Sequence, residues 1–349
     1  MFNYLLRKIV YGLLVLAGVV TLVFWMFQGF GDPARMVMGQ TGDSATIANI
    51  KKELYLDQPK WKQFVLYVND VSPIAVHSKE EINKKELSGL FIGGETNLAF
   101  KIPYLRKSYV TKKDVWEVLT EAFPGTIMLA LAAMFIATVL GITLGVIAAV
   151  KKDSWLDTSS VFTSILGISA PSFFMGILIA YFFGFVLSSY TGLNMTGSWF
   201  DIDIQTGEKK LKLQNLILPA ITLGIRPLAI ITQLTRSAML DVLNQDFVRT
   251  AYAKGLSKRT VIWKHALRNA LNPVITAVTG WFAELLAGAF FVEYIFGWRG
   301  IGKVTVDALE KLDYPVVMGS VLLSAFIFVL INILADVLYG VVDPRVRVG

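Results

Sequence analysis

The sequence predicts an all-α membrane protein with six transmembrane helices and an extracytoplasmic segment between the first two. Hydrophobic residues make up 54% of the 349 residues and charged residues only 17%, whereas soluble domains are typically about 25% charged. The apolar residues gather in runs of about 20, the length at which a helix crosses the hydrocarbon core. The short loops between several of these runs are rich in Lys and Arg, as cytoplasmic loops are.

The apolar runs place the six spans at residues 9–27, 124–150, 161–187, 216–240, 274–296 and 316–342. Arg7 and Lys8 precede the first run, as in a signal peptide, but the run is long and no cleavage site follows, so we expect an uncleaved helix. The predicted parts are a first transmembrane helix (1–30), an extracytoplasmic segment (31–115) and a five-helix core (116–349). The core includes an inner loop at 241–272.

The charges of the short loops predict the orientation. The loop at 151–157 begins with two Lys, the 241–272 segment carries six basic and two acidic residues, and the C-terminal tail carries Arg345 and Arg347. Because short loops rich in Lys and Arg stay on the cytoplasmic side, we expect both termini and the 241–272 loop in the cytoplasm.

The extracytoplasmic segment is predicted to contain two short amphipathic helices. Ser44 is expected to cap a helix that ends near Leu54. After Pro59, a second helical face is formed by Trp61, Phe64, Val65 and Val68. Such helices suit either the outer membrane surface or a small lid packed on the transmembrane helices, and both interpretations stay open. The stretch at 72–107 has turn residues and mixed polarity, and its fold is not assigned.

Several kinds of site are disfavoured. With no Cys and only two His, the chain offers no disulfide, and we expect no metal site and no catalytic Ser, His and Asp set, hence no enzyme. The net charge of +7 fits a membrane surface, because no RNA-binding pattern accompanies it. The segment GWRGIGKV (297–304) is close to a nucleotide-binding P-loop, but Val304 replaces the hydroxyl that holds magnesium.

The most informative segment is the inner loop at 246–272. A first helix is expected to end before Gly255, the residue that most easily takes a left-handed C-cap. Ser257 is expected to cap a second short helix that carries Trp263, and Asn272-Pro273 is expected to close the unit before the next span. A basic helical hairpin with an apolar face predicts a docking element. The alternative is a solvated loop at the membrane interface.

This loop resembles the EAA loop in membrane subunits of bacterial ABC importers, and more narrowly the first permease subunit of the dipeptide, oligopeptide and nickel family. That pattern is close to RTARAKGLSxxxVxxxHALRNALxPV, and residues 249–274 read RTAYAKGLSKRTVIWKHALRNALNPV. Further matching pieces are GDP (31–33), LDQP (56–59), LTRS (234–237), VE (292–293), GIG (300–302), DYPV (313–316) and DPR (343–345). They keep the family's order across nearly the whole chain. The departures are a longer 72–107 segment and two charges, Arg226 and Glu284.

The resemblance implies a type I (MetI-like) importer permease in the bacterial inner membrane. It implies a second permease subunit, usually non-identical, two cytoplasmic ATPase subunits that carry ATP and Mg, and an extracytoplasmic substrate-binding protein. No cofactor is expected on this chain and no nucleic acid among its partners. The implied cargo is a di- or oligopeptide. The alternatives are nickel or another small solute, or a stand-alone secondary transporter outside the family.

The resemblance also implies that the inner loop couples to the ATPase. The residues expected to do so are Arg249, Thr250, Ala251, Lys254, Gly255, Leu256, Ser257, Trp263, His265 and Arg268.

Two charges lie inside predicted spans. Arg226 is ten residues from the outer end of the fourth span and Glu284 twelve residues from that of the fifth, about 15–18 Å deep at 1.5 Å per residue. A lone charge at that depth is costly and usually faces the bundle interior and pairs. We therefore expect an ion pair between them, beside or across a translocation path, or a structural strut unrelated to substrate.

Overall fold

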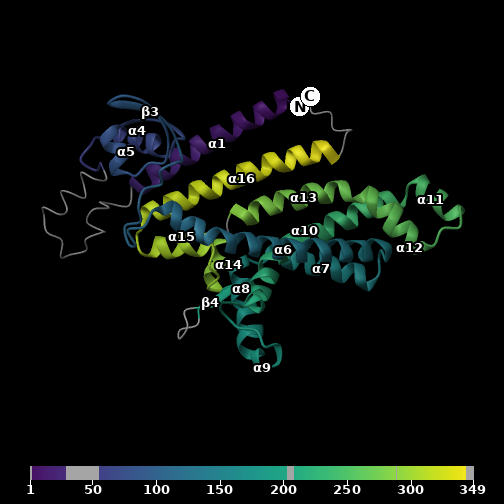
Figure 1. Cartoon of the computed structure of the whole chain (residues 1–349). Helices are drawn as coiled ribbons and strands as arrows, with labels where there is room; N and C mark the ends of the chain where they lie inside the picture. Colours follow the sequence, from purple (N-terminus) through teal and green to yellow (C-terminus); the bar gives the residue numbers. More distant parts are fainter. Residues whose placement is uncertain (1, 29–54, 203–207, 288, 343–349) are drawn as a thin grey trace. The chain divides into compact units, whose positions relative to one another are not determined.

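The structure, a computed structural model, describes residues 2–28, 55–202, 208–287 and 289–342 (Figure 1). The chain forms two compact units, one with residues 124–303 and 327–349 and the other with residues 2–123 and 304–326. The helix predicted between Ser44 and Leu54 lies outside the described residues. Each unit is described by itself below.

The described residues include five helices long and apolar enough to span a membrane, and a sixth candidate span is a bent pair of helices. The five lie in α1 (Phe2–Gln28), α6 (Val115–Val150), α10 (Ile217–Leu243), α13 (Leu267–Ala287) and α16 (Tyr314–Val342). The five helices and the bent pair overlap the six predicted spans, which confirms the helical membrane fold at the level of length and composition.

The third predicted span is not one helix. It consists of α7 (Trp155–Ser169) and α8 (Ser172–Tyr181), which meet at 108°, and α8 continues into a π-helical turn, Phe182–Val186. Pro171 lies at the bend. Proline cannot donate a backbone hydrogen bond, and it forces the preceding residue out of the helical region. Ala170 accordingly has an extended conformation, with ψ of 130°.

The fifth predicted span ends too late. Helix α13 stops at Ala287, and a separate short helix, α14 (Phe290–Ile295), follows. The predicted range 274–296 therefore included both the spanning helix α13 and the separate short helix α14. The chain then forms α15 (Ile301–Glu310) before the last span.

Helix α10 is the centre of the unit that holds residues 124–303. Helices α13, α7 and α8 all pack against it, and Figure 1 shows α10 and α13 side by side. Helix α6 approaches it through the small residues Gly141 and Gly145, as a ridge of small residues allows. A Cβ on Gly145 would come within 2.6 Å of Thr235, and one on Gly141 within 2.8 Å of Ile231. Between α8 and α10 lie α9 (Ser188–Thr191), β4 (Phe200–Ile202), β5 (Lys209–Leu211) and a 3-10 turn (Leu213–Leu216).

The stretch at 72–107, unassigned from sequence, forms most of a small α/β fold. Its elements are α4 (Lys60–Val71), β1 (Ile74–Ser78), α5 (Lys79–Lys84), β2 (Gly89–Gly93) and β3 (Thr96–Lys101). The three strands are antiparallel in the order β1-β3-β2. Burial alternates along β1 and β3, as in a sheet with one covered face.

The predicted helix after Pro59 exists, but its apolar face is turned outward. Trp61 is 67% exposed and Val65 is 55% exposed, whereas Gln63, Tyr67 and Asp70 are buried. The polar side points inward because Asp70 meets cations of the small fold.

Asp70 is the centre of a buried charge cluster in the small fold. Its carboxylate lies 2.5 Å from Lys85 Nζ and 3.4 Å from Arg106, and its backbone carbonyl accepts a hydrogen bond from Lys101 Nζ. Burial lowers the pKa of Lys101 to about 8. The Asp70 carboxylate acts in the opposite direction, and the positive charge of Lys85 lowers this pKa further. Burial also raises the pKa of Tyr109 to about 12.

Asp313 immediately precedes α16 and connects this helix to residues 108–110, which follow the small fold in the same unit. Its carboxylate accepts hydrogen bonds from the Ser108 hydroxyl at 2.5 Å and from the Tyr109 and Val110 backbone N–H groups at 2.9 and 3.4 Å. This buried carboxylate is one of the contacts between residues 304–326 and the N-terminal part of the chain.

Candidate functional site

The inner loop begins with α11 (Asp246–Ala253), and its end has the predicted geometry. Gly255 has a φ of +78°, the left-handed conformation that favours glycine. The Gly255 N–H donates to the Tyr252 carbonyl at 2.9 Å, and the Leu256 N–H donates to the Ala251 carbonyl at 3.3 Å. These are the two bonds of a Schellman motif. The predicted C-cap at Gly255 is therefore confirmed. The helix itself ends at Ala253, one residue earlier than expected.

The second helix also begins as predicted, but it does not end as predicted. The Ser257 hydroxyl accepts a hydrogen bond from the Thr260 N–H, which caps α12 (Lys258–Thr260). A π-helical turn (Val261–Ala266) then leads without a break into α13, so one helix runs from Lys258 to Ala287. The expected closure at Asn272-Pro273 is wrong. Pro273 lies inside the helix, which continues past it although proline cannot donate the backbone hydrogen bond of that turn.

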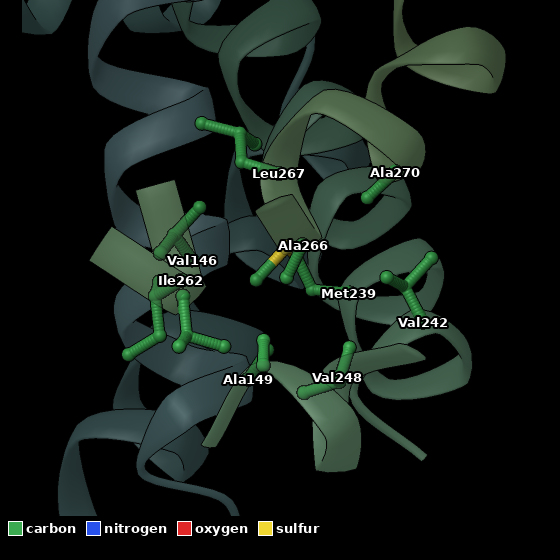
Figure 2. Packing of buried hydrophobic residues seen from close by; sticks show 11 residues of the cluster. Val146, Ala149, Met239, Val242, Val248, Ile262, Ala266, Leu267 and Ala270 are labelled. Carbon is green, nitrogen blue, oxygen red and sulfur yellow. The ribbon is translucent and has the colours of Figure 1, made fainter. Parts of the chain in front are cut away.

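One side of the loop is buried against the ends of two spanning helices (Figure 2). Val248 of α11 and Ile262 of the π-helical turn meet Val146 of α6 and Met239 of α10 in a single apolar cluster. The full buried cluster is Val146, Ala149, Met239, Val242, Val248, Ala251, Val261, Ile262, Ala266, Leu267 and Ala270. A cluster of this size holds the loop as a fixed part of the membrane unit rather than as a solvated linker.

The other side of the loop is exposed and holds most of the predicted coupling residues. Exposed are Arg249, Thr250, Lys254, Gly255, Leu256, Ser257, Trp263 and Arg268; His265 is half-buried. Trp263 is 45% exposed although its neighbour Ile262 is buried. Ala251 is different, because it lies inside the apolar cluster and offers no surface to a partner. Phe247 and Tyr252 are exposed aromatic residues of α11 that sequence reasoning missed; they flank the helical face that carries the buried Val248 and Ala251, and their place at the two edges of that face was the available signal.

An ion pair joins α7 to α10 near this loop. The Arg236 guanidinium donates to both carboxylate oxygens of Asp157, at 2.5 Å from Nε and 2.8 Å from a terminal nitrogen. Asp157 also accepts the Asp153 N–H at 3.0 Å and is buried. In the sequence, Arg236 belongs to the LTRS segment (234–237) that resembles the family pattern, but no role was predicted for it. Bidentate pairs of this kind fix geometry as well as contribute energy.

Arg226 and Glu284 do not form the expected ion pair. Both line the same cavity, of about 170 Å³, between α8, α10, α13 and α14. Within the described part of the chain, Arg226 instead lies over the ring of Trp281, at 5.6 Å from its centroid. The two charged residues thus line one cavity without an ion pair between them.

The P-loop-like segment is filled from inside the protein. Glu293 of α14 is fully buried, and its carboxylate accepts hydrogen bonds from the Thr126 hydroxyl at 2.8 Å and from the Lys303 N–H at 3.1 Å, in the first turn of α15. A side chain on Gly300 would overlap this carboxylate. The helix N-terminus that cradles phosphate in a P-loop is therefore already occupied by a carboxyl group of the protein itself.

Comparison with known proteins identifies the family of the chain. Residues 141–348 match the family model described as binding-protein-dependent transport system inner membrane component. Residues 1–130 match the N-terminal model for membrane components of the same transport systems. The chain belongs to this family. The first match contains the inner loop and the cavity, and the second contains the small α/β fold, so both parts described above lie within the family.

Curated relatives cover the same length. The chain is 36% identical to the di/tripeptide transport system permease protein DppB of Pseudomonas aeruginosa over 99% of both chains. It is 44% identical to the dipeptide transport system permease protein DppB of Haemophilus influenzae, over 69% of this chain and 76% of that one. It is 32% identical to the glutathione transport system permease protein GsiC of Escherichia coli, over 99% of both.

Solved structures support the fold. The MetNI methionine ABC transporter, in an inward-facing conformation, is similar with a TM-score of 0.51 and 16% identity, over 65% of this chain and 97% of that chain. The expected MetI-like permease fold is therefore confirmed, and the chain is a membrane component of a transport system.

Proposed function

We propose that this chain is one of two permease subunits in an ATP-driven importer of di- or oligopeptides. The named cargo of its relatives supports this: dipeptides, di- and tripeptides, and glutathione, itself a tripeptide of γ-linked form. An extracytoplasmic binding protein delivers the peptide, as the family description implies. A second permease, most simply a non-identical one, completes the path.

The two-sided inner loop carries the second part of the proposal, the coupling to ATPase subunits. Its buried side fixes it to α6 and α10, and its exposed side presents Trp263 and Leu256 among basic residues. Such an apolar centre with a charged rim is typical of protein interfaces. ATP and Mg are held by the partner ATPases, on the cytoplasmic side together with the loop and both termini.

The continuity of the loop with a span gives the coupling a mechanism. The capped start at Ser257 and the helix from Lys258 to Ala287 form one element, so a displacement of the docking end moves α13 directly. ATP binding on the partner subunits closes them, shifts the docked helices and alternates the access of the path. This is rigid-body transmission through a packed element rather than a flexible signal.

The proposal is tested with two tryptophan variants in the complete importer. Trp263→Ala removes the exposed ring of the loop, and Trp155→Ala is a matched control because Trp155 is also exposed but lies at the start of α7. Both are reconstituted in proteoliposomes with the second permease, the ATPases and the binding protein. ATP-dependent dipeptide uptake and co-purification of the ATPase are measured.

Trp263→Ala should lower ATPase co-purification and uptake at least tenfold, since an exposed aromatic anchor at the centre of an interface is commonly worth 2 kcal/mol or more. Trp155→Ala should leave both unchanged. Equal behaviour of the two variants would contradict coupling through the loop. Absence of peptide uptake by the wild-type complex would contradict the peptide cargo.

A further inference from the structure

The cavity that holds Arg226 and Glu284 has an unusual lining for a membrane unit. Its walls carry one cation, one anion and the aromatic residue Trp281, together with the hydroxyl-bearing residues Ser172 and Thr222. The remaining wall is apolar. At about 170 Å³ the cavity is smaller than the pockets of about 300–1,000 Å³ that hold drug-sized ligands. It suits a small peptide or the end of a longer one.

Among the residues that the structure describes, neither charge has an ion-pair partner. Both side chains are exposed, and Arg226 lies over the Trp281 ring. Both lie within helices long and apolar enough to span a membrane. A charge facing lipid at that depth is strongly disfavoured, so this side of α10 and α13 must face water, substrate or protein.

The surface of α13 leads to the same conclusion independently of the two charges. Every fourth residue along it is exposed and polar or small: Arg268, Asn272, Thr276, Gly280 and Glu284. Residues four apart share one helical face, so this stripe runs the length of the span and ends at the cavity. Gly280 has open space where a Cβ would lie, so it does not serve close packing within the chain. A lipid-facing stripe would be apolar instead.

Two interrupted helices meet at the cavity. Ala170 and Ser172 line it at the bend between α7 and α8, and Ala289 and Phe290 line it at the break between α13 and α14. Non-helical backbone at membrane depth is tolerated where it borders a polar cavity or is buried in protein. Broken helices of this kind border the substrate sites of many transporters.

We propose that this cavity binds peptides in zwitterionic form, with Arg226 holding the C-terminal carboxylate and Glu284 the N-terminal ammonium group. The inference rests on the proposed peptide importer and specifies which part of the cargo the membrane subunit reads. A guanidinium binds a carboxylate through two parallel hydrogen bonds. A peptide that supplies both charges neutralises both cavity groups at once, whereas a peptide capped at either end leaves one of them unpaired.

The test measures binding to the assembled complex of both permeases and the ATPases in nanodiscs, without the binding protein, so that its own selectivity does not enter. Labelled dialanine is the probe, and N-acetyl-dialanine and dialanine amide are the competitors. Wild-type complex should bind dialanine at least tenfold more tightly than either capped peptide. Arg226→Gln should weaken dialanine at least tenfold but leave the affinity for dialanine amide unchanged. Glu284→Gln should also weaken dialanine binding at least tenfold, but it should leave the affinity for N-acetyl-dialanine unchanged.

The controls separate this inference from folding and from the proposed function. Thr276→Ala, on the same stripe but outside the cavity lining, should bind all three ligands as wild type does. If a neutral variant does not assemble, Arg226→Lys and Glu284→Asp keep the charge and should retain the preference for the uncapped end. Loss of affinity for all three ligands in equal measure, or unchanged preference in both neutral variants, would overturn the inference. Normal ATP-driven dipeptide uptake with such a result would leave the importer assignment standing.

Discussion

Truncation of Ile262 tests whether the inner loop is held by its apolar cluster. Ile262 is 7% exposed and lies between α6 and α10, whereas the adjacent Trp263 is 45% exposed. Ile262→Ala removes three buried carbons, which is about 2.4 kcal/mol at about 0.8 kcal/mol per carbon. The cavity left behind adds to this cost, and such truncations span about 2–5 kcal/mol. We expect about 3 kcal/mol of lost local stability.

Hydrogen exchange of the 246–266 amides in the assembled permease pair, in nanodiscs and without ATPase subunits, measures this loss. Exchange through local opening reports the free energy of that opening. A loss of about 3 kcal/mol corresponds to exchange faster by roughly a hundredfold, because about 1.4 kcal/mol is one factor of ten. Trp263→Ala should leave the exchange of these amides within about twofold of wild type, since its ring contributes little to the cluster.

The two variants therefore separate holding the loop from docking to it. Ile262→Ala should loosen the loop and, through that, weaken ATPase binding. Trp263→Ala should weaken ATPase binding with the loop still closed. If Trp263→Ala speeds exchange as much as Ile262→Ala, or if Ile262→Ala has no effect on exchange, the division of the loop into a packed side and a docking side is refuted.

Two further predictions concern the rest of the chain. The small α/β fold should become more stable as pH rises from about 8 to 10, because Lys101 is neutral there when folded but still charged when unfolded, with an ordinary pKa of 10.5. Above pH 10 the trend should reverse, because Tyr109 ionises only when unfolded; exchange of β3 amides, corrected for intrinsic rates, measures both. Gly300→Ala should reduce assembly sharply by displacing the Glu293 carboxylate. Gly280→Ala, with open space at the Cβ, should assemble normally on size-exclusion chromatography.

The parts of the loop that the sequence revealed are those with local causes. Gly255 ends α11 because only a residue without Cβ takes a positive φ there at low cost, and Ser257 starts α12 through a bond to a residue three positions on. Both signals lie within a few residues of the feature they produce. The apolar runs likewise predict spans, because the requirement for length and hydrophobicity comes from the membrane alone.

Features that depend on distant partners were not visible in the sequence. The outward Trp61 face of α4 follows from the charge partners of Asp70, which come from residues 85–106. From the sequence, Ala251 was predicted to be a coupling residue. Its burial against α6 and α10 is visible only in the structure. The bend at Pro171 did have a local cause, and the apolar composition on both sides of it concealed the break.

One helix connects the two sites proposed for this chain. Trp263 lies at the docking end of the helix that begins at Lys258, and Glu284 lies near its other end, 21 residues later in the printed sequence. At 1.5 Å per residue the two are about 30 Å apart along the axis. A rigid element of this kind carries a displacement of the docking end to the cavity wall without any intermediate contact. Coupling between sites is reciprocal, so if ATPase closure lowers the affinity of the cavity for a zwitterionic peptide, bound peptide must resist that closure by the same factor. The polar stripe of α13 lies between the two sites on this same helix, so it would move together with the docking end.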